Sequence, residues 1–277
     1  RLVSFFFSNK KLVVHCHRNN EIIRMLFFRM LGFKFTLIAT RHAESKPSKL
    51  TLTLLKQADK IVTLTKSMSE NLGIKNTVVG HGVDIDFFIP KEQLRLKAIS
   101  QQNIILCVGR VRGSKGQEVL FESAKVLRGN KNWAIVVVGK VEKLSFLQKL
   151  QSIANKHFIE NQVYFIDETP DISSYYQAAK VVVVPSFSEG FSLVAAEAMS
   201  CGCTVIATKK VGVHSLLIEN NKNGYLFESG NKAQLENLLL GLIKNKILFL
   251  GKEARKKITN KWSSKSEANK LIELYQK

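Results

Sequence analysis

The stretch that decides the fold is P-S-F-S-E-G-F-S-L-V-A-A-E at Pro185–Glu197, which directly follows the apolar run V-V-V-V at Val181–Val184. This order predicts a buried strand, a tight turn and then a helix. Ligands bind at the carboxyl ends of strands in open α/β sheets, and the turn places Glu189 and Gly190 at such an end. Glu197 lies inside the following helix, which rises about 1.5 Å per residue. The helix start between the two carboxylates has free N–H groups and a positive dipole end, which suit a diphosphate.

This motif belongs to a longer alternation of strands and helices. Strands are predicted at Asn103–Gly109, Trp133–Gly139, Val163–Asp167, Lys180–Pro185, Gly202–Thr208 and Gly224–Phe227. Helices are predicted at Gly116–Arg128, Glu142–Lys156 and Ile172–Ala179, and in a C-terminal helical region. Strands and helices that alternate at this spacing are typical of a parallel α/β domain.

A second, shorter alternation precedes it. Strands are predicted at Lys11–His17, Phe35–His42, Ala58–Thr65 and Asn76–Asp84, and helices at Glu21–Gly32 and Ser67–Gly73. The pattern lapses into a polar stretch around Pro90–Gln102, where we place a domain boundary. We therefore predict an α/β fold of two facing, doubly wound Rossmann-like domains with the ligand in the cleft between them. The predicted domains are 1–95 and 96–260, with a C-terminal helix at 261–277 returning toward the first.

The amino-acid composition limits which class of protein this chain can be and which kinds of partner it can bind. The chain has 277 residues, 45% of them hydrophobic, which is enough for one large core or two modest ones. No apolar run approaches the roughly 20 residues that cross a bilayer. The formal net charge is +20, which indicates an anionic partner: nucleic acid, an anionic membrane or a phosphorylated substrate. Cys201 and Cys203 lack the spacing of zinc or redox motifs, so the cysteines are predicted to be small buried thiols.

A basic loop precedes the helix that begins at Gly116. The sequence G-R-V-R-G-S-K-G starts at Gly109 and brings Arg110, Arg112 and Lys115 beside the helix start. It is neither a Walker loop nor a dinucleotide fingerprint. The arrangement suits a diphosphate held without a metal, and the alternative is an ordinary loop with solvated charges.

Two other features each have competing interpretations. Asp84-Ile85-Asp86 spells a D-x-D pattern, but its position in a turn between the domains argues against a metal site. The Phe-rich segment Met25–Phe35, with its basic residues, is either a core-packed helix or a basic helix that contacts a membrane. The D-x-D pattern is therefore set aside, while the role of the Phe-rich segment stays open.

Taken together, the motifs resemble those of a GT-B-fold retaining glycosyltransferase of glycosyltransferase family 4. The family pairs a Gly-Arg…Lys-Gly phosphate loop with an E-G-F-G-L-x-x-x-E-A-M motif, which here read G-R-V-R-G-S-K-G and E-G-F-S-L-V-A-A-E-A-M. The segments V-V-H-C-H, T-R-H, V-G-H-G-V-D and the tail with Trp262 and Tyr275 extend the resemblance over essentially the whole chain. Within the family, the chain looks most like bacterial transferases of the lipopolysaccharide core.

The resemblance implies a role for each matching residue. Arg110 and Lys115, after Gly109, would neutralise the donor diphosphate, and Glu197 would accept hydrogen bonds from the ribose. Glu189 would hold the transferred sugar, with the backbone amides of Gly190 and Phe191 and the neighbouring Ser192 beside it. His42, and less directly His17, would reach the sugar or the acceptor from the first domain. No cofactor or metal is implied.

The sequence departs from the family pattern at several positions. Ser192 replaces the usual Gly, His81 replaces the usual Asn, and Ser215 replaces a Glu. Nothing matches the first strand and glycine-rich loop of the family, so we expect the first domain to be incomplete.

The predicted function is a metal-independent hexosyl transfer with retention, which serves bacterial lipopolysaccharide or cell-envelope glycan synthesis. The donor would be a UDP-, GDP- or ADP-sugar and the acceptor a lipid-linked or oligosaccharide chain. The expected location is cytoplasmic, peripheral on an anionic membrane surface, with no nucleic-acid partner. The alternatives are an incompetent fragment that binds nucleotide-sugar and a basic membrane- or nucleic-acid-binding protein.

Overall fold

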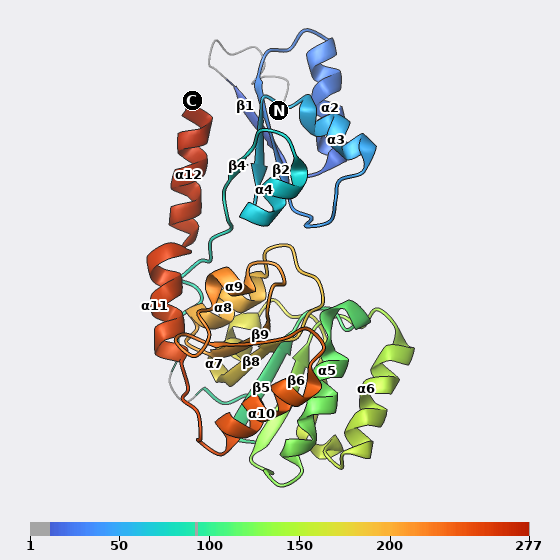
Figure 1. Cartoon of the computed structure of the whole chain (residues 1–277), viewed down its shortest axis with the longest axis vertical. Helices are drawn as coiled ribbons and strands as arrows, with labels where there is room; N and C mark the ends of the chain where they lie inside the picture. The colour runs from blue at the N-terminus through green and yellow to red at the C-terminus, as the bar shows by residue number, and fades with distance from the viewer. Residues whose placement is uncertain (1–11, 92–93, 277) are drawn as a thin grey trace. The chain divides into compact units, whose positions relative to one another are not determined.

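The computed structural model of the chain describes residues 12–91 and 94–276 (Figure 1). Its backbone divides into two compact units. The amino-terminal unit comprises the chain up to His81 together with the segment from Lys265, and the carboxyl-terminal unit runs from Gly82 to Ser264. The division thus falls before the polar stretch in which the sequence analysis placed the boundary.

Within residues 12–81, the amino-terminal unit contains a four-stranded parallel sheet in the order β1-β2-β3-β4. Its strands are β1 (Val13–Cys16), β2 (Thr36–Arg41), β3 (Lys60–Thr63) and β4 (Thr77–Val78). Its described helices are α2 (Asn19–Met30), α3 (Lys49–Lys56), α4 (Lys66–Leu72) and, except for its first residue, α12 (Ser264–Gln276). Helix α3 was not predicted, although Ser48 caps it by accepting a hydrogen bond from the backbone N–H of Thr51.

Side chains of β2 alternate between two apolar layers. Leu37 and Ala39 pack in a cluster with Leu55 of α3, whereas Ile38 between them packs with Leu274 of α12. Both faces of this sheet are therefore covered, which explains the nearly continuous apolar sequence of the strand.

The carboxyl-terminal unit contains a six-stranded, fully parallel sheet in the order β10-β9-β8-β5-β6-β7. Its strands are β5 (Asn103–Val108), β6 (Trp133–Val138), β7 (Val163–Ile166), β8 (Ala179–Val184), β9 (Thr204–Thr208) and β10 (Tyr225–Phe227). Its α-helices are α5 (Gln117–Ser123), α6 (Leu144–Lys156), α7 (Ile172–Ala178), α8 (Leu193–Ser200), α9 (His214–Leu217), α10 (Lys232–Ile243) and α11 (Gly251–Lys261). Short 3₁₀ turns are η1 (Gly113–Lys115), η2 (Ala124–Leu127) and η3 (Glu160–Gln162). The strand–turn–helix predicted at the opening motif is confirmed as β8, its loop and α8.

The strand order creates a switch point between β5 and β8. From β5 the chain proceeds outward to β6 and β7, and it then returns to the other side of β5 to form β8, β9 and β10. The connections that leave these two adjacent strands therefore run in opposite directions. In open α/β sheets a crevice opens at such a point, outside the carboxyl ends of the strands.

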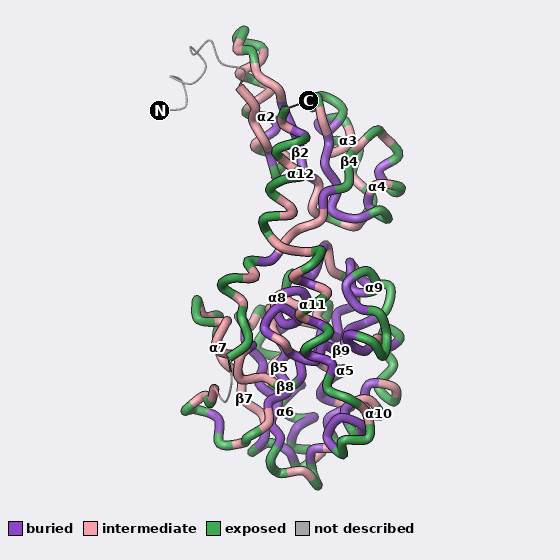
Figure 2. Tube along the Cα trace, turned by 90° about the vertical axis from the view of Figure 1, so that its left-hand side faces the viewer, coloured by how far each residue is buried: buried purple, intermediate pink, exposed green. Residues whose placement is uncertain are grey.

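The core of the carboxyl-terminal unit lies along the strands, where buried residues concentrate in Figure 2. Every residue of β6 is buried, and α5, α6 and α10 supply Leu120, Leu150 and Leu239 to the same cluster. All four cysteines are buried and unpaired, as predicted. Burial raises the pKa of the Cys107 thiol to about 12, so this thiol is unreactive at neutral pH.

A membrane-spanning helix is not found among the described residues, because none of their helices combines sufficient length with sufficient apolar character.

Candidate functional site

Two loops meet at the switch point of the carboxyl-terminal sheet. The loop after β5 ends at Gly116, and the loop after β8 begins at Pro185. The backbone N–H of Phe187 donates to the carbonyl of Ser114 at 3.0 Å. Gly116 has φ +68°, and a Cβ built on it would lie 2.0 Å from the carbonyl oxygen of Pro185. Glycine is required here because the backbones of the two loops touch.

A largely buried ion pair joins the two loops. Lys115 Nζ lies 2.7 Å from Glu189 Oε1, and the two side chains are only 18% and 11% exposed. The Ser186 hydroxyl donates to the same carboxylate oxygen at 2.6 Å. The aliphatic part of Lys115 passes over Gly109, where an added Cβ would lie 3.6 Å from Lys115 Cε. The structure thus brings together three predicted site residues from two separate motifs: Gly109, Lys115 and Glu189.

The two arginines of the basic loop have a different partner. Arg110 Nη1 lies 2.9 Å and Arg112 Nη1 3.2 Å from the same oxygen of Glu142. The Arg110 side chain is largely exposed, and its carbonyl accepts from Gln117 Nε2 at 2.9 Å. Arg110 therefore lies on the same loop as Lys115 but is paired with a separate carboxylate.

Glu197 lies in α8 beside a buried tyrosine. The Tyr176 hydroxyl donates to Glu197 Oε2 at 2.9 Å. Burial raises the pKa of Glu197, while the hydrogen bond from Tyr176 acts in the opposite direction. The Tyr176 hydrogen bond thus falls on Oε2 of this carboxylate.

Ser192 occupies a backbone conformation that favours glycine. Its φ is +70° and its ψ 62°, so the family's usual Gly would adopt it without strain. The side chain has a specific partner, because its hydroxyl lies 2.9 Å from His214 Nε2. His214 Nδ1 lies 2.8 Å from the carbonyl of Thr208; since a carbonyl only accepts, Nδ1 carries the hydrogen and Nε2 accepts from Ser192.

His214 was missed by the sequence analysis. It is buried, and burial lowers its pKa, so the ring is neutral at physiological pH. The only sign in the sequence was its place in V-G-V-H-S-L-L at Val211–Leu217, where Ser215 had drawn attention as a departure from the family. In the structure it is the neighbouring His214, not Ser215, that supports the Ser192 loop through the hydrogen bond with the Ser192 hydroxyl.

Phe191 and Gly190 differ in how far they are exposed to solvent. The Phe191 side chain is buried, and its ring centroid lies 5.5 Å from that of Trp262. Gly190 is partly exposed. Phe191 therefore anchors the loop through its ring.

His17 and His42 lie in the amino-terminal unit, just after β1 and β2. Their Nδ1 and Nε2 atoms, respectively, are 3.0 Å apart. Both line a pocket of about 170 Å³ whose polar lining includes Arg18 and Arg41. The structure thus places the two predicted histidines together at the carboxyl edge of their own sheet.

The D-x-D pattern has a structural role. Asp84 Oδ1 accepts from the backbone N–H groups of Asp86 at 3.1 Å and Phe87 at 3.0 Å, so it closes a turn. Across residues 12–91 and 94–276, no three His, Cys, Asp or Glu side chains are grouped in a way that could hold a metal ion.

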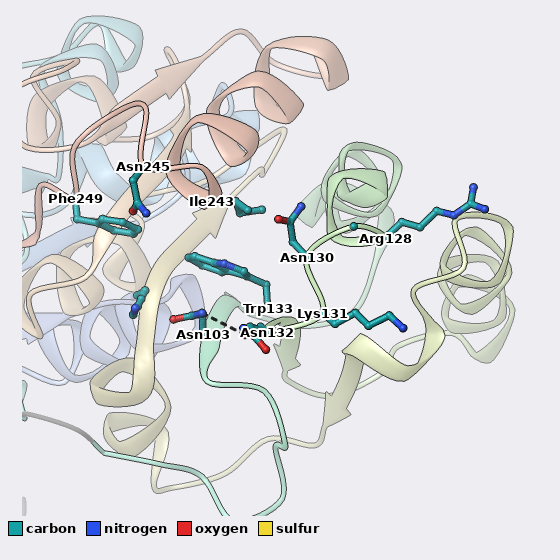
Figure 3. A pocket seen from close by; sticks show the side chains of 11 residues that line it. Asn103, Arg128, Asn130, Lys131, Asn132, Trp133, Ile243, Asn245 and Phe249 are labelled. Carbon is teal, nitrogen blue, oxygen red and sulfur yellow. Dashed lines mark hydrogen bonds between the residues drawn. The ribbon is translucent and has the colours of Figure 1, made fainter.

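A separate pocket of about 560 Å³ opens at the amino ends of the strands of the carboxyl-terminal sheet (Figure 3). Asn103 and Trp133, the first residues of β5 and β6, contribute to its lining. The rings of Trp133 and Phe249 are parallel within 8° and 6.5 Å apart. None of the predicted site residues lines this pocket. Because ligands of open α/β sheets bind at the carboxyl ends, we do not assign it to the site.

Comparison with known proteins identifies the family to which this chain belongs. Residues 89–263, more than half of the chain, match the family model described as "Glycosyl transferases group 1". The chain is 25% identical over 276 residues to the lipopolysaccharide core biosynthesis mannosyltransferase LpcC of Rhizobium leguminosarum bv. viciae, covering 96% of this chain and 78% of that protein. It is 27% identical over 215 residues to the corresponding LpsB of Rhizobium meliloti, covering 74% of this chain and 61% of that protein.

Solved structures agree with the fold. The C-terminal domain of a group 1 glycosyltransferase (LpcC) from Francisella tularensis aligns with a TM-score of 0.62 and 33% identity, covering 66% of this chain and 99% of that one. Anabaena HepE, solved in complex with UDP, aligns with a TM-score of 0.84 and 19% identity, covering 96% of this chain and 78% of that one. The predicted GT-B α/β fold is confirmed. The strand order, the paired loops at the switch point and the family match lead to one conclusion: the chain belongs to the group 1 glycosyltransferases.

Proposed function

We propose that this chain transfers a hexosyl group from a nucleotide-sugar to a saccharide or lipid-linked acceptor, with retention and without a metal. The observation that carries the proposal is the Lys115–Glu189 pair at the β5/β8 switch point. It holds a cation and a carboxylate where a parallel sheet binds its ligand. The names of the Rhizobium relatives support lipopolysaccharide core assembly as the process.

The site residues divide into those that meet the diphosphate and those that meet the sugars. Lys115 and Arg110 would stabilise the negative charge that develops on the leaving diphosphate. The low exposure of Lys115 strengthens this effect, because electrostatic interactions grow as water is excluded. Glu189 would accept from the hydroxyls of the transferred sugar and Glu197 from the ribose diol. With retention, the leaving diphosphate stays on the face that the acceptor hydroxyl approaches, so no enzyme nucleophile is needed.

Donor binding is the first test of this proposal. Thermal unfolding should be recorded with UDP-, GDP- and ADP-linked sugars, because a ligand at 100 times its Kd stabilises the folded state by about 2.7 kcal/mol. For a unit of this size, we expect the matching donor to raise Tm by about 5–10 °C. Absence of any shift across the whole panel, together with absence of transfer to lipopolysaccharide-core acceptors, would contradict the proposal.

Glu197→Ala should weaken donor binding. A hydrogen bond to a charged group contributes about 1.5–3 kcal/mol, so loss of the ribose contact should raise the donor Kd by about 10- to 100-fold. Titration calorimetry measures this directly. Glu197→Gln, which keeps an acceptor for the Tyr176 hydroxyl, separates ribose binding from the support of Tyr176. Glu236→Ala, at a carboxylate that pairs with exposed Lys125, should leave the Kd unchanged; equal affinity in Glu197→Ala and wild type would remove Glu197 from the site.

We further infer that the amino-terminal unit docks on an anionic cytoplasmic membrane surface through α2. Ile22 of this helix is buried in the core, but Phe27 and Met30 are 56% and 84% exposed. Ile23 and Leu31 are exposed as well, so an apolar stripe continues along the outer side of the helix. The segments of this unit, 1–81 and 265–277, together carry 17 Lys or Arg and 6 Asp or Glu, a difference of +11. An apolar stripe on a basic unit is the combination that binds anionic lipid.

Replacing Phe27 and Met30 together with aspartate should abolish this docking. We expect at least a tenfold loss of partitioning into vesicles with an anionic phospholipid fraction, measured by co-sedimentation. Tm should change little, since both side chains already face solvent. Leu248→Asp, at an exposed position of the carboxyl-terminal unit, is the matched control. Wild-type partitioning of the double variant would argue against docking by α2.

A further inference from the structure

Ser192 stands at the start of α8 but does not cap that helix. Serine is among the residues most favoured as an N-cap, where its backbone is extended and its hydroxyl accepts from an N–H of the first turn. Here the backbone of Ser192 is left-handed, with φ +70° and ψ 62°. Within the described part of the chain, its side chain makes no capping hydrogen bond to the helix. The N–H groups of the first turn are therefore not occupied by the Ser192 hydroxyl.

The side chain of His214 explains where the hydroxyl goes instead. His214 is buried, and its Nδ1–H donates to the carbonyl of Thr208 at 2.8 Å. Its Nε2 then accepts from the Ser192 hydroxyl at 2.9 Å. Burial lowers the pKa of His214, which keeps Nε2 as an acceptor at neutral pH. The Ser192 hydroxyl is thus held against the imidazole rather than against the helix start.

The segment from Thr208 to His214 holds the loop between β8 and α8 at two further points. Thr208 is buried at the end of β9, and its hydroxyl donates to the carbonyl of Ser186 at 2.6 Å. A Cβ built on Gly212 would lie 3.0 Å from Cβ of Glu189, so the backbone of the segment packs directly on the loop. We call the loop, residues 185–192, the Ser192 loop. Its conformation is set by this segment as well as by its own sequence.

Ser192 has two ways to use its hydroxyl, and they require different backbones. As an ordinary N-cap it would be extended and would occupy an N–H group of α8. Bonded to His214, it is left-handed and leaves those groups unoccupied. A left-handed backbone disfavours a residue with a Cβ by a factor of about 5–30 relative to glycine. The observed conformer of Ser192 therefore needs a stabilising partner, and His214 supplies it.

We propose that His214 is a positioning residue that holds the Ser192 loop in the conformer that binds the sugar donor. This inference rests on the proposed function, in which the backbone at Gly190 and Phe191 lies beside the transferred sugar. When the hydroxyl leaves His214 and caps α8, the loop backbone turns out of the conformer that binds the donor, and an N–H group at the helix start is occupied. His214 acts through Ser192 and is assigned no contact with the donor.

The coupling between positions 192 and 214 tests this proposal. In His214→Asn the amide N–H can still donate to Thr208, but the acceptor for the Ser192 hydroxyl is lost. We expect this change to raise the donor Kd about tenfold in titration calorimetry, because the apparent Kd rises as the binding-competent fraction falls. Made together with Ser192→Gly, the same change should alter the Kd less than twofold. Glycine has no side chain to cap the helix and adopts the left-handed backbone without strain.

Ser192→Ala separates the hydroxyl from the backbone. Alanine neither bonds to His214 nor caps the helix, but it keeps the Cβ that disfavours a left-handed backbone. We therefore expect Ser192→Ala to bind the donor about 5- to 30-fold more weakly than Ser192→Gly. Equal Kd values for these two variants would mean that donor binding does not require the left-handed conformer.

A buried serine elsewhere in the same unit provides the matched control. The hydroxyl of Ser123 donates to the carbonyl of Lys232 at 2.8 Å, and Ser123 is fully buried. Ser123→Ala should lower Tm by about 2–4 °C through loss of one hydrogen bond while the donor Kd stays at the wild-type value. His214→Asn should lower Tm and also raise the Kd, and only the effect on the Kd should disappear with Ser192→Gly.

The outcomes distinguish this proposal from the proposed function. If the wild type binds a donor but His214→Asn keeps the wild-type Kd, or raises it equally in both backgrounds, His214 does not position the Ser192 loop. If the wild type neither binds a donor nor transfers sugar, the proposed function is wrong and the role of His214 falls with it.

Discussion

Lys115→Ala should lower kcat for sugar transfer by about 10²- to 10³-fold, the loss that follows when one preorganised partner of developing charge is removed. Lys115 is the cation held at the switch point, 2.7 Å from Glu189 and largely shielded from water. The substitution should change donor binding in the ground state only slightly, because the diphosphate gains its extra charge only as the bond to the sugar breaks. Steady-state kinetics should therefore show a fall in kcat with a much smaller change in donor Kd.

Two controls test the assignment of Lys115. Lys115→Arg keeps the positive charge and should recover part of the activity. Lys149→Ala removes a lysine in an exposed ion pair of the same 2.7 Å length, with Glu118, and should leave kcat unchanged. A large rise in donor Kd with an unchanged kcat in Lys115→Ala would instead assign Lys115 to ground-state binding alone.

Gly116→Ala should disrupt both the fold of the carboxyl-terminal unit and the site. The left-handed backbone costs an alanine about 1–2 kcal/mol, and its Cβ would lie 2.0 Å from the carbonyl oxygen of Pro185. Since a backbone atom cannot move aside as a side chain can, the two loops must separate, at a further cost of about 1–3 kcal/mol. We expect a loss of about 2–5 kcal/mol, a fall in Tm of about 4–20 °C and a collapse of transfer.

Gly113→Ala is the matched control for this prediction. Gly113 lies in the same loop, but an added Cβ there would meet no atom within 4 Å, and its φ is not in the left-handed region. Its Tm and kcat should stay near those of the wild type. If Gly116→Ala matched Gly113→Ala in both measurements, close contact between the loops would not be a requirement of the site.

Local patterns predicted the elements that hold the site. The apolar runs before Gly109 and Pro185 identified β5 and β8, and the turn residues identified the loops that follow them. That Lys115 pairs with Glu189 was not predicted, since the contact joins residues 74 positions apart. It depends on the strand order, which the spacing of strands along the chain does not determine.

The hydrogen-bonded row of His17, His42, His81 and Glu267 shows the same limit more strongly. His17 and His42 were predicted site residues, because each follows a strand at the carboxyl edge of its sheet. His81 was noted only as a departure from the family, and Glu267 was not considered, since 186 positions separate the two. Likewise, Ser192 was read as a mild change from Gly; its left-handed backbone and its bond to His214 depend on tertiary structure. Single positions of this kind acquire their roles only from neighbours that the sequence does not reveal.

The placement of α12 has a consequence for biosynthesis. The helix packs Leu274 into the amino-terminal core, and its carbonyl at that residue accepts from Lys60 Nζ at 2.6 Å. The segment from Lys265 leaves the ribosome only after the entire carboxyl-terminal unit has been translated. The amino-terminal unit is therefore synthesised first but completed last. Until α12 has been translated, the face of its sheet that carries Ile38 lacks the packing that Leu274 provides. A stop codon just before Lys265 would spare every residue of the phosphate-side loops and still leave the amino-terminal unit unfinished.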